Sequence, residues 1–218
     1  MKKILAMLLA LVMVLSLAAC ASTQPAAEPA ASSDAPAESG KTYTVGICQL
    51  VQHEALDAAT QGFVDALKEA LGDAVTIDVQ NASGDSVNCG TIVNGFVAKG
   101  VDLIMANATP ALTAAVSATA DIPILGTSIT AYGVALDIDD FSGTVGGNVS
   151  GTSDLADLQK QAQMILDWFP ETKTVGLLFC SAEPNSRYQI DEVRKALEAQ
   201  GVTCEEFAFT DSNDVSSV

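Results

Sequence analysis

The sequence repeats one short unit, and this repeat constrains the fold more than any single motif does. Thr44-Val45-Gly46-Ile47 leads through a polar loop into an amphipathic helical pattern, and Thr174-Val175-Gly176-Leu177 does the same later in the chain. The similarity continues beyond the two helices, where residues 81–87 align with residues 210–215. Two copies of one β-loop-α-β unit predict two similar lobes.

Short apolar runs alternate with helical periodicity along the first copy. Residues 44–47, 75–79, 101–106 and 122–125 are typical of strands, and the segments between them carry apolar residues at helical spacing. This alternation is the signature of a parallel sheet with helices on both faces. We therefore predict an α/β fold of two doubly wound parallel-sheet lobes.

The segment between the two lobes has the weakest strand and helix periodicity. We expect lobe 1 at residues 42–132, a glycine-rich crossover at 133–154 and lobe 2 at 155–218, with Leu155 and Phe169 facing the interior. Val218 corresponds to a position near Asn88 of the first copy. We therefore expect the second lobe to be incomplete, because the first copy continues with two more strands.

The first residues are typical of bacterial export. Residues 1–19 combine two lysines with an apolar run too short to span a bilayer, as in a signal peptide. Leu17-Ala18-Ala19-Cys20 resembles a lipobox, which predicts lipidation at Cys20 and attachment to a membrane surface. Residues 20–41, rich in Ala, Pro, Ser and Glu, are expected to form a flexible linker.

Charge and motifs exclude several classes of function. A formal net charge of −17 argues against nucleic-acid binding, which needs a basic surface. No Cys/His spacing typical of zinc and no nucleotide-binding glycine loop occurs, so we expect neither metal nor cofactor. Cys48 and Cys180 occupy nearly equivalent places in the two copies, and we expect both to be unpaired thiols in separate lobes.

Ligands of open α/β sheets bind beyond the carboxyl ends of the strands. The loops expected there are rich in hydroxyl and amide groups, and helix starts after them offer backbone N–H groups to a carboxylate. The candidate ligand-binding residues are Gln52, His53, Asp85, Asn88, Thr109, Pro110, Thr127, Ser128, Glu183, Asn185 and Ser186.

Each candidate also has a plainer structural role. His53 is the only histidine, and without a nucleophile motif nearby we expect it to bond a ligand or its own loop, and we expect no enzyme activity. Asp85 before Ser86 suits a helix cap, and it also suits the partner of a ligand ammonium group. Thr109-Pro110 suits a helix start, and Glu183 to Ser186 suits a turn.

Five blocks in order carry a resemblance to a known family. Gln49 to Ala59 resembles the opening of substrate-binding lipoproteins of ABC importers of the tryptophan/tyrosine type. Later blocks of that family are similar to residues 81–85, 106–110, 146–154 and 183–186. Where members often carry Thr-Asp-Pro after the fourth strand, this chain has Thr127-Ser128-Ile129.

The resemblance implies a type I periplasmic-binding-protein fold with a hinged cleft. It implies an extracytoplasmic, lipid-anchored monomer that captures a small solute, an amino acid that is aromatic in some members, for an ABC permease and its ATPase. The ligand-sensing ectodomain of a receptor with the same fold is the alternative, and the lipobox disfavours it. A surface hydrolase is disfavoured because no nucleophile signature occurs.

Overall fold

The computed structural model describes residues 40–210 and 213–218. The predicted signal peptide, the lipidation site at Cys20 and nearly all of the predicted linker lie outside these residues. The described part begins just before the first strand of the repeat.

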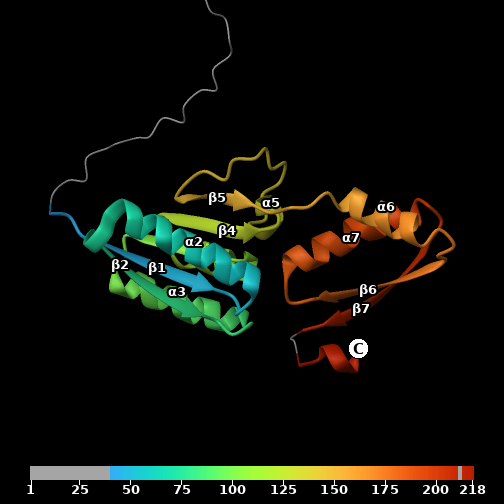
Figure 1. The fold of residues 1–218 in the computed structure, drawn as a ribbon, viewed down its shortest axis with the longest axis horizontal. Helices are drawn as coiled ribbons and strands as arrows, with labels where there is room; N and C mark the ends of the chain where they lie inside the picture. Colours follow the sequence, from blue (N-terminus) through green and yellow to red (C-terminus); the bar gives the residue numbers. More distant parts are fainter. Residues whose placement is uncertain (1–39, 211–212) are drawn as a thin grey trace, which may run out of the picture. The chain divides into compact units, whose positions relative to one another are not determined.

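Five parallel strands form the first sheet. They are β1 (Tyr43–Gln49), β2 (Val75–Asn81), β3 (Leu103–Asn107), β4 (Ile124–Ile129) and β5 (Val149–Ser153), in the order β2-β1-β3-β4-β5 (Figure 1). This order reverses direction at β1, as in a doubly wound sheet. The predicted fold class is confirmed.

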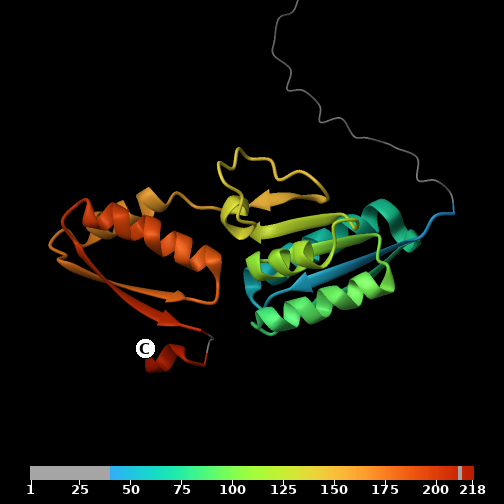
Figure 2. The ribbon, with the colours of Figure 1, turned by 180° about the vertical axis from the view of Figure 1, so that it is seen from behind.

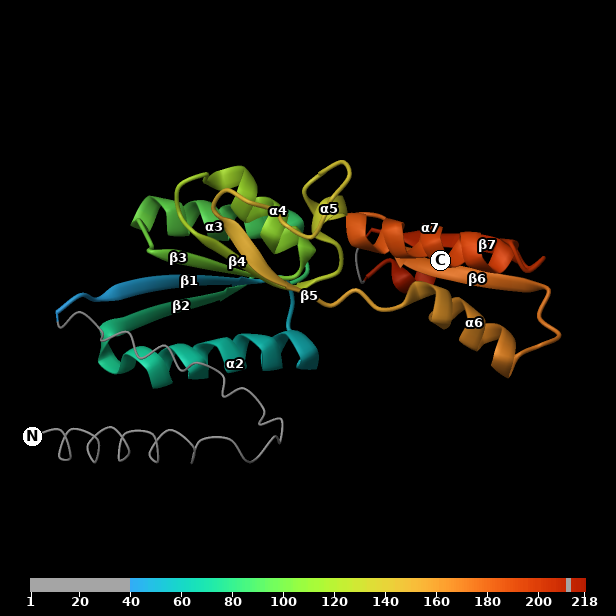
Figure 3. The ribbon, with the colours of Figure 1, turned by 90° about the horizontal axis from the view of Figure 1, so that it is seen from above.

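Helices cover both faces of this sheet. Helix α2 (Glu54–Leu71), followed by the short turn η1 (Gly72–Ala74), lies on one face, and α3 (Ser86–Lys99) and α4 (Thr109–Ala118) lie on the other (Figure 3). Seen from behind in Figure 2, α3 and α4 lie in front of the strands. The short helix α5 (Tyr132–Ala135) follows β4.

Strand β1 supplies side chains to two separate cores because successive residues point to opposite faces. Val45 and Ile47 pack with Val64 of α2 in one cluster. Cys48 packs with residues of α3 and α4 in the other. Both faces of the strand are therefore buried, which accounts for its uninterrupted apolar sequence.

The helices of this lobe begin and end where local chemistry predicts. Asp85 caps α3 through a 2.8 Å hydrogen bond from the Val87 N–H. Gly100 ends α3 in the left-handed conformation, with φ of 65°. Gly72 follows α2 at a φ of 55°.

Strand β5 and helix α5 were not predicted. Helix α5 begins at Tyr132, the last residue of the predicted first lobe. Strand β5 lies in the glycine-rich segment 133–154, which the sequence pattern assigned to a crossover, yet it pairs with β4 and extends the first sheet. Tyr132 fixes this edge, because its hydroxyl donates a 3.0 Å hydrogen bond to the carbonyl of Gly126 in β4. Gly151 of β5 lies against both residues at a φ of 151°, and a larger side chain would collide with them.

The second sheet has two described strands. Strands β6 (Thr174–Cys180) and β7 (Thr203–Phe209) are parallel, and α7 (Pro184–Glu198) covers one face of them (Figure 1). Helix α6 (Leu158–Trp168) packs on α7 around Ala162 and Leu197, and the short turn η2 spans Val215–Ser217.

Several apolar side chains of this part are exposed. Leu178 and Phe207, on the sheet face away from α7, are 53% and 37% exposed. The prediction that Leu155 and Phe169 face the interior is wrong. Leu155 precedes α6 and Phe169 follows it, so neither lies on the buried stripe of the helix, and both are exposed.

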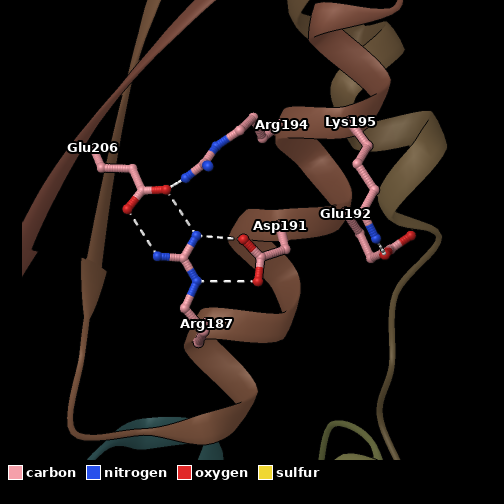
Figure 4. Close-up of polar contacts among 6 residues, drawn as sticks. All are labelled: Arg187, Asp191, Glu192, Arg194, Lys195 and Glu206. Carbon is pink, nitrogen blue, oxygen red and sulfur yellow. Dashed lines mark hydrogen bonds and ion pairs between the residues drawn. The ribbon is translucent and has the colours of Figure 1, made fainter.

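An ion-pair cluster fastens α7 to β7 (Figure 4). The Arg187 guanidinium donates two 2.8 Å hydrogen bonds to the Glu206 carboxylate, and it also pairs with Asp191 one turn along α7. Arg194 pairs with the same Glu206. The Arg187 bonds hold the pKa of Asp191 below its usual range. The cluster keeps the Arg187 guanidinium 4.7 Å from the centre of the Phe179 ring.

The space above Gly46 provides a test of packing between β1 and α3. A methyl group at Gly46 would lie 2.5 Å from the Phe96 ring, whereas one at Gly95 of α3 would meet nothing within 4 Å. We expect Gly46→Ala to lower the free energy of unfolding by about 1–3 kcal/mol. Gly95→Ala should raise it by about 0.5–1 kcal/mol. Urea denaturation of both variants checks this, and an unchanged Gly46→Ala would contradict the packing described.

Tyr132 should make stability depend on alkaline pH. Burial raises the pKa of Tyr132 to about 12, above the ordinary value of 10.0. The unfolded chain therefore loses this proton first, and folded stability falls as pH rises from about 10 to about 12. We expect Tyr132→Phe to flatten that part of the Tm profile, with Tyr43→Phe as control. Parallel profiles for the parent and Tyr132→Phe would rule out this contribution.

Candidate functional site

A cavity of about 1040 Å³ opens at the carboxyl ends of strands from both sheets. The first lobe contributes the segments after β1, β2 and β3 and the starts of α3 and α4, including Leu50, Val51, Asp85, Ser86 and Pro110. The second lobe contributes the last residues of β6 and β7 and the first turns of α7, including Phe179, Glu183, Ser186, Ile190 and Phe209. The lining thus combines apolar surface with hydroxyl and carboxylate groups, as expected for a small polar ligand with an apolar part.

The predicted site residues divide into two groups. Asp85, Pro110, Glu183 and Ser186 line this cavity and are brought together by it. The others are not among its lining residues: Gln52, His53, Asn88, Thr109, Thr127, Ser128 and Asn185. Three of this second group, Asn88, Thr127 and Asn185, make hydrogen bonds within or next to the segments that carry the first.

His53 is the N-cap of α2. Its Nδ1 atom accepts a 3.2 Å hydrogen bond from the Ala55 N–H, one of the amide groups that has no partner within the helix. Both His53 and the neighbouring Gln52 are exposed. The histidine therefore starts the helix that follows β1.

Asp85 and Asn88 shape the loop between β2 and α3. The Asp85 carboxylate caps α3 while the residue also lines the cavity. The Asn88 amide donates a 3.2 Å hydrogen bond to the Ala82 carbonyl at the start of the loop. One Asp85 carboxylate oxygen is used by the cap, which leaves the other without a hydrogen bond to the residues that the structure describes.

The start of α4 is unusual. Ala108 precedes it with φ and ψ of 89° and 157°, a region nearly confined to glycine and costing about 1–3 kcal/mol for other residues. No side chain caps this helix. The Thr109 hydroxyl at its first position is on a residue 2% exposed, and its Oγ1 atom has no hydrogen-bond partner among the described residues. The next residue, Pro110, lines the cavity.

Thr127 and Ser128 lie at an irregularity of β4. The pairing register with β5 shifts between Gly126 and Ile129, and Ser128 has a φ of 56°. The Thr127 carbonyl accepts a 3.0 Å hydrogen bond from the Ala108 N–H. Bulges of this kind often redirect side chains next to binding sites. Here the bulge supports the strained residue that precedes α4.

The start of α7 in the second lobe is similarly uncapped. Glu183 is the N-cap residue, but its side chain makes no capping bond. Instead its Oε2 atom accepts 3.3 Å hydrogen bonds from the Asn185 amide and the Ser186 hydroxyl. The Oδ1 atom of Asn185 is buried without a hydrogen-bond partner in the described structure. Both lobes therefore place an uncapped helix start, with a buried polar atom that lacks a partner, beside the cavity.

Sequence reasoning missed a buried polar network beneath the first-lobe loops. The Thr60 hydroxyl accepts a 2.9 Å hydrogen bond from the Asn107 amide and donates one of 2.6 Å to Gln49. The Gln49 amide in turn donates to the Val51 carbonyl and the Asp57 carboxylate, at 2.8 and 2.5 Å. The only sequence signal was that Gln49 and Asn107 end otherwise apolar strands.

The described residues have neither a cluster of metal ligands nor a helix suited to a membrane. Residues 40–210 and 213–218 contain no group of three or more His, Cys, Asp or Glu side chains arranged to hold a metal ion. Over the same residues, every helix is too short or too polar to cross a bilayer.

Comparisons with known proteins agree with the architecture. The family model described as ABC transporter substrate binding protein matches residues 44–218. A tyrosine-binding protein of Clostridioides difficile (strain R20291) is 34% identical over 222 residues, covering 99% of this chain and 63% of the relative.

Two solved structures are also similar. The ABC domain in complex with L-Trp from Streptococcus pneumonia is 36% identical, with a TM-score of 0.74. A ligand-free, open substrate binding protein with adhesive properties from Clostridium difficile is 37% identical, with a TM-score of 0.56. Each match covers 81% of this chain and 60% of the other.

The match spans both sheets and the loops of the cavity. The chain spans about three fifths of the length of each of these relatives. On the family match and on the identity to the tyrosine-binding protein, the chain belongs to the ABC transporter substrate binding protein family.

Proposed function

We propose that the chain is part of an extracytoplasmic binding protein that captures an amino acid in the cavity and delivers it to an ABC permease. A separate ATPase would power the permease. The relatives support this class of solute, since one is named for tyrosine and another was solved with L-Trp. Attachment to the membrane through a lipid on Cys20 and action as a monomer are parts of the same proposal.

The uncapped start of α4 is the observation that carries the proposal. A helix N-terminus attracts a carboxylate through its free N–H groups and dipole. The buried Thr109 hydroxyl has no partner in the described structure, and a buried unpaired hydroxyl destabilises a protein by roughly 1–3 kcal/mol. Together with the strain at Ala108, this arrangement is costly for folding alone. Thr109 does not itself line the cavity, but the adjoining Pro110 does, and a ligand carboxylate bonded to the Thr109 hydroxyl would remove this cost.

The remaining groups of the cavity suit the rest of an amino acid. Asp85 and Glu183 supply carboxylates of the sign needed by an ammonium group. Leu50, Phe179 and Phe209 supply apolar surface for a side chain. Because these groups come from both sheets, a ligand that contacts all of them favours the closed arrangement of the lobes, which the permease would recognise.

Thr109→Val tests the carboxylate site in the full-length protein. The variant removes the unpaired hydroxyl and keeps the shape, so we expect the unliganded Tm to stay the same or rise. The affinity for the amino acid should fall about 10-fold to 100-fold through loss of a charge-assisted hydrogen bond. Calorimetric titration with L-Trp, L-Tyr and the other amino acids measures it.

Thr113→Val is the matched control for that experiment. Thr113 lies one turn along the same helix, and its hydroxyl already donates a 3.0 Å hydrogen bond to the Pro110 carbonyl. Its affinity should stay within about 3-fold of the parent, because no ligand bond is removed. A lower Tm with unchanged affinity in Thr109→Val would assign the hydroxyl a structural role only.

Asp85 offers a test that separates capping from ligand binding. Asp85→Ala should lower the free energy of unfolding by about 1 kcal/mol through loss of the cap. Asp85→Ser keeps a capping oxygen, so its stability should stay close to that of the parent. If the carboxylate pairs with the ligand ammonium group, both variants lose affinity. Parent-like affinity in Asp85→Ser would exclude the ion pair.

A further inference from the structure

Two buried cysteines meet directly below the loops of the first lobe. Cys48 lies on the face of β1 that packs against α3, and Cys89 lies in the first turns of α3. Both are fully buried, with 0% exposure, in one apolar cluster. Backbone hydrogen bonds from Ala82 to Gln49 and from Gly84 to Leu50 hold the segment before α3 next to the end of β1, which places the two thiols side by side. Neither lines the cavity. In the sequence, Cys48 matches Cys180 by its place in the repeat, and no pattern there indicates that Cys89 lies next to it.

We propose that Cys48 and Cys89 form a disulfide when the chain folds in an oxidising compartment. The proposal rests on the extracytoplasmic location inferred above, because disulfides persist there and are rare in the cytosol. The structure holds the pair as thiols in contact. Because both thiols are inaccessible once α3 has packed on β1, oxidation takes place during folding, before that contact forms.

The chemistry of the pair sets the order of the reaction. Cys89 lies near the N-terminus of α3, where the helix dipole favours a thiolate once that helix has formed. Cys48 lies on a strand, which supplies no comparable dipole. Cys89 is therefore the first nucleophile, and Cys48 is the second.

The oxidant is a disulfide, either of a small thiol or of a protein oxidoreductase. The Cys89 thiolate attacks one of its sulfurs, forming a mixed disulfide and releasing one thiol. Cys48 then loses its proton and attacks the Cys89 sulfur, which releases the second thiol. Two protons and two electrons pass to the external disulfide, so one dithiol and one disulfide become one disulfide and two thiols.

This cross-link would secure loops that are already joined by backbone hydrogen bonds. Just beyond Cys48, the Gln49 carbonyl accepts from Ala82 at 2.9 Å and the Leu50 carbonyl accepts from Gly84 at 2.8 Å. The disulfide would add a covalent link between β1 and α3 beside these bonds. It closes a loop of roughly 40 residues, for which an increase in Tm on the order of 10 °C is expected.

The other two described cysteines do not offer an alternative pair within the second lobe. Cys204 is paired in register with Val175 near the start of β6, whereas Cys180 is paired with Phe209 at its end. The two lie at opposite ends of the same pair of strands, beyond the reach of a disulfide.

Oxidative refolding of the full-length protein tests the proposal. Reduced, unfolded protein is refolded with reduced and oxidised glutathione, then unfolded in urea in the presence of iodoacetamide and digested without reductant. We expect a Cys48–Cys89 linked peptide in the mass spectrum and a Tm on the order of 10 °C higher than in dithiothreitol. The double variant Cys48→Ala/Cys89→Ala should lose this redox-dependent shift, and Cys204→Ala should keep it.

Alkylation of both Cys48 and Cys89 after this refolding, with the same Tm in both buffers, would overturn the proposal. Peptide mapping of the unmutated protein decides the question even where the double variant does not fold. No amino acid ligand is used, so the result is independent of whether the chain binds one.

Discussion

The buried hydrogen bonds from Asn107 through Thr60 to Gln49 determine where the loops of the first lobe begin. Asn107 ends β3, Gln49 ends β1, and Thr60 projects from α2 between them. Since the Asn107 amide and the Thr60 hydroxyl act as donors in series, each group can adopt only one orientation. Buried polar groups without partners are costly, so the two strand ends and the helix are held in one arrangement. The loop containing Val51 is then attached to a fixed point, because the Gln49 amide also bonds the Val51 carbonyl.

The opposite face of β1 makes the same strand end rigid for a different reason. At Gly46 the Phe96 ring lies directly against the backbone. Two residues farther along the same face, Cys48 packs in one cluster with Cys89. Successive side chains of β1 point to opposite faces, so one face of the strand contacts α2 through polar and apolar groups and the other packs closely on α3. A one-residue shift of β1 would break both sets of contacts at once. The loop after β1 can carry binding groups because neither face of its strand has freedom to move.

Sequence reasoning succeeded where local signals are strong and failed where tertiary contacts decide. The repeat, the strand alternation and the helix start at Asp85 depend on neighbouring residues, and the corresponding elements form as predicted. Strand β5 depends instead on the Tyr132 hydroxyl and on backbone approach at Gly151, which no periodicity reveals. The same holds for the site. Threonine before proline predicts a helix start, but only the fold shows that the Thr109 hydroxyl is buried without a partner in the described structure.

The helices that begin next to the cavity are not equivalent, and this difference favours a hinged mechanism. Helix α3 is capped by its own Asp85 side chain, whereas α4 in the first lobe and α7 in the second have no side-chain cap. A helix that is already capped gains little from an added anion, while an uncapped one gains a bond for each N–H that is satisfied. The uncapped N–H groups, which gain most from a bound anion, are therefore found in both lobes, at the starts of α4 and α7. In the proposed function, a ligand held by one lobe alone satisfies only half of them, and the additional bonds made on closure bias the equilibrium toward the closed form.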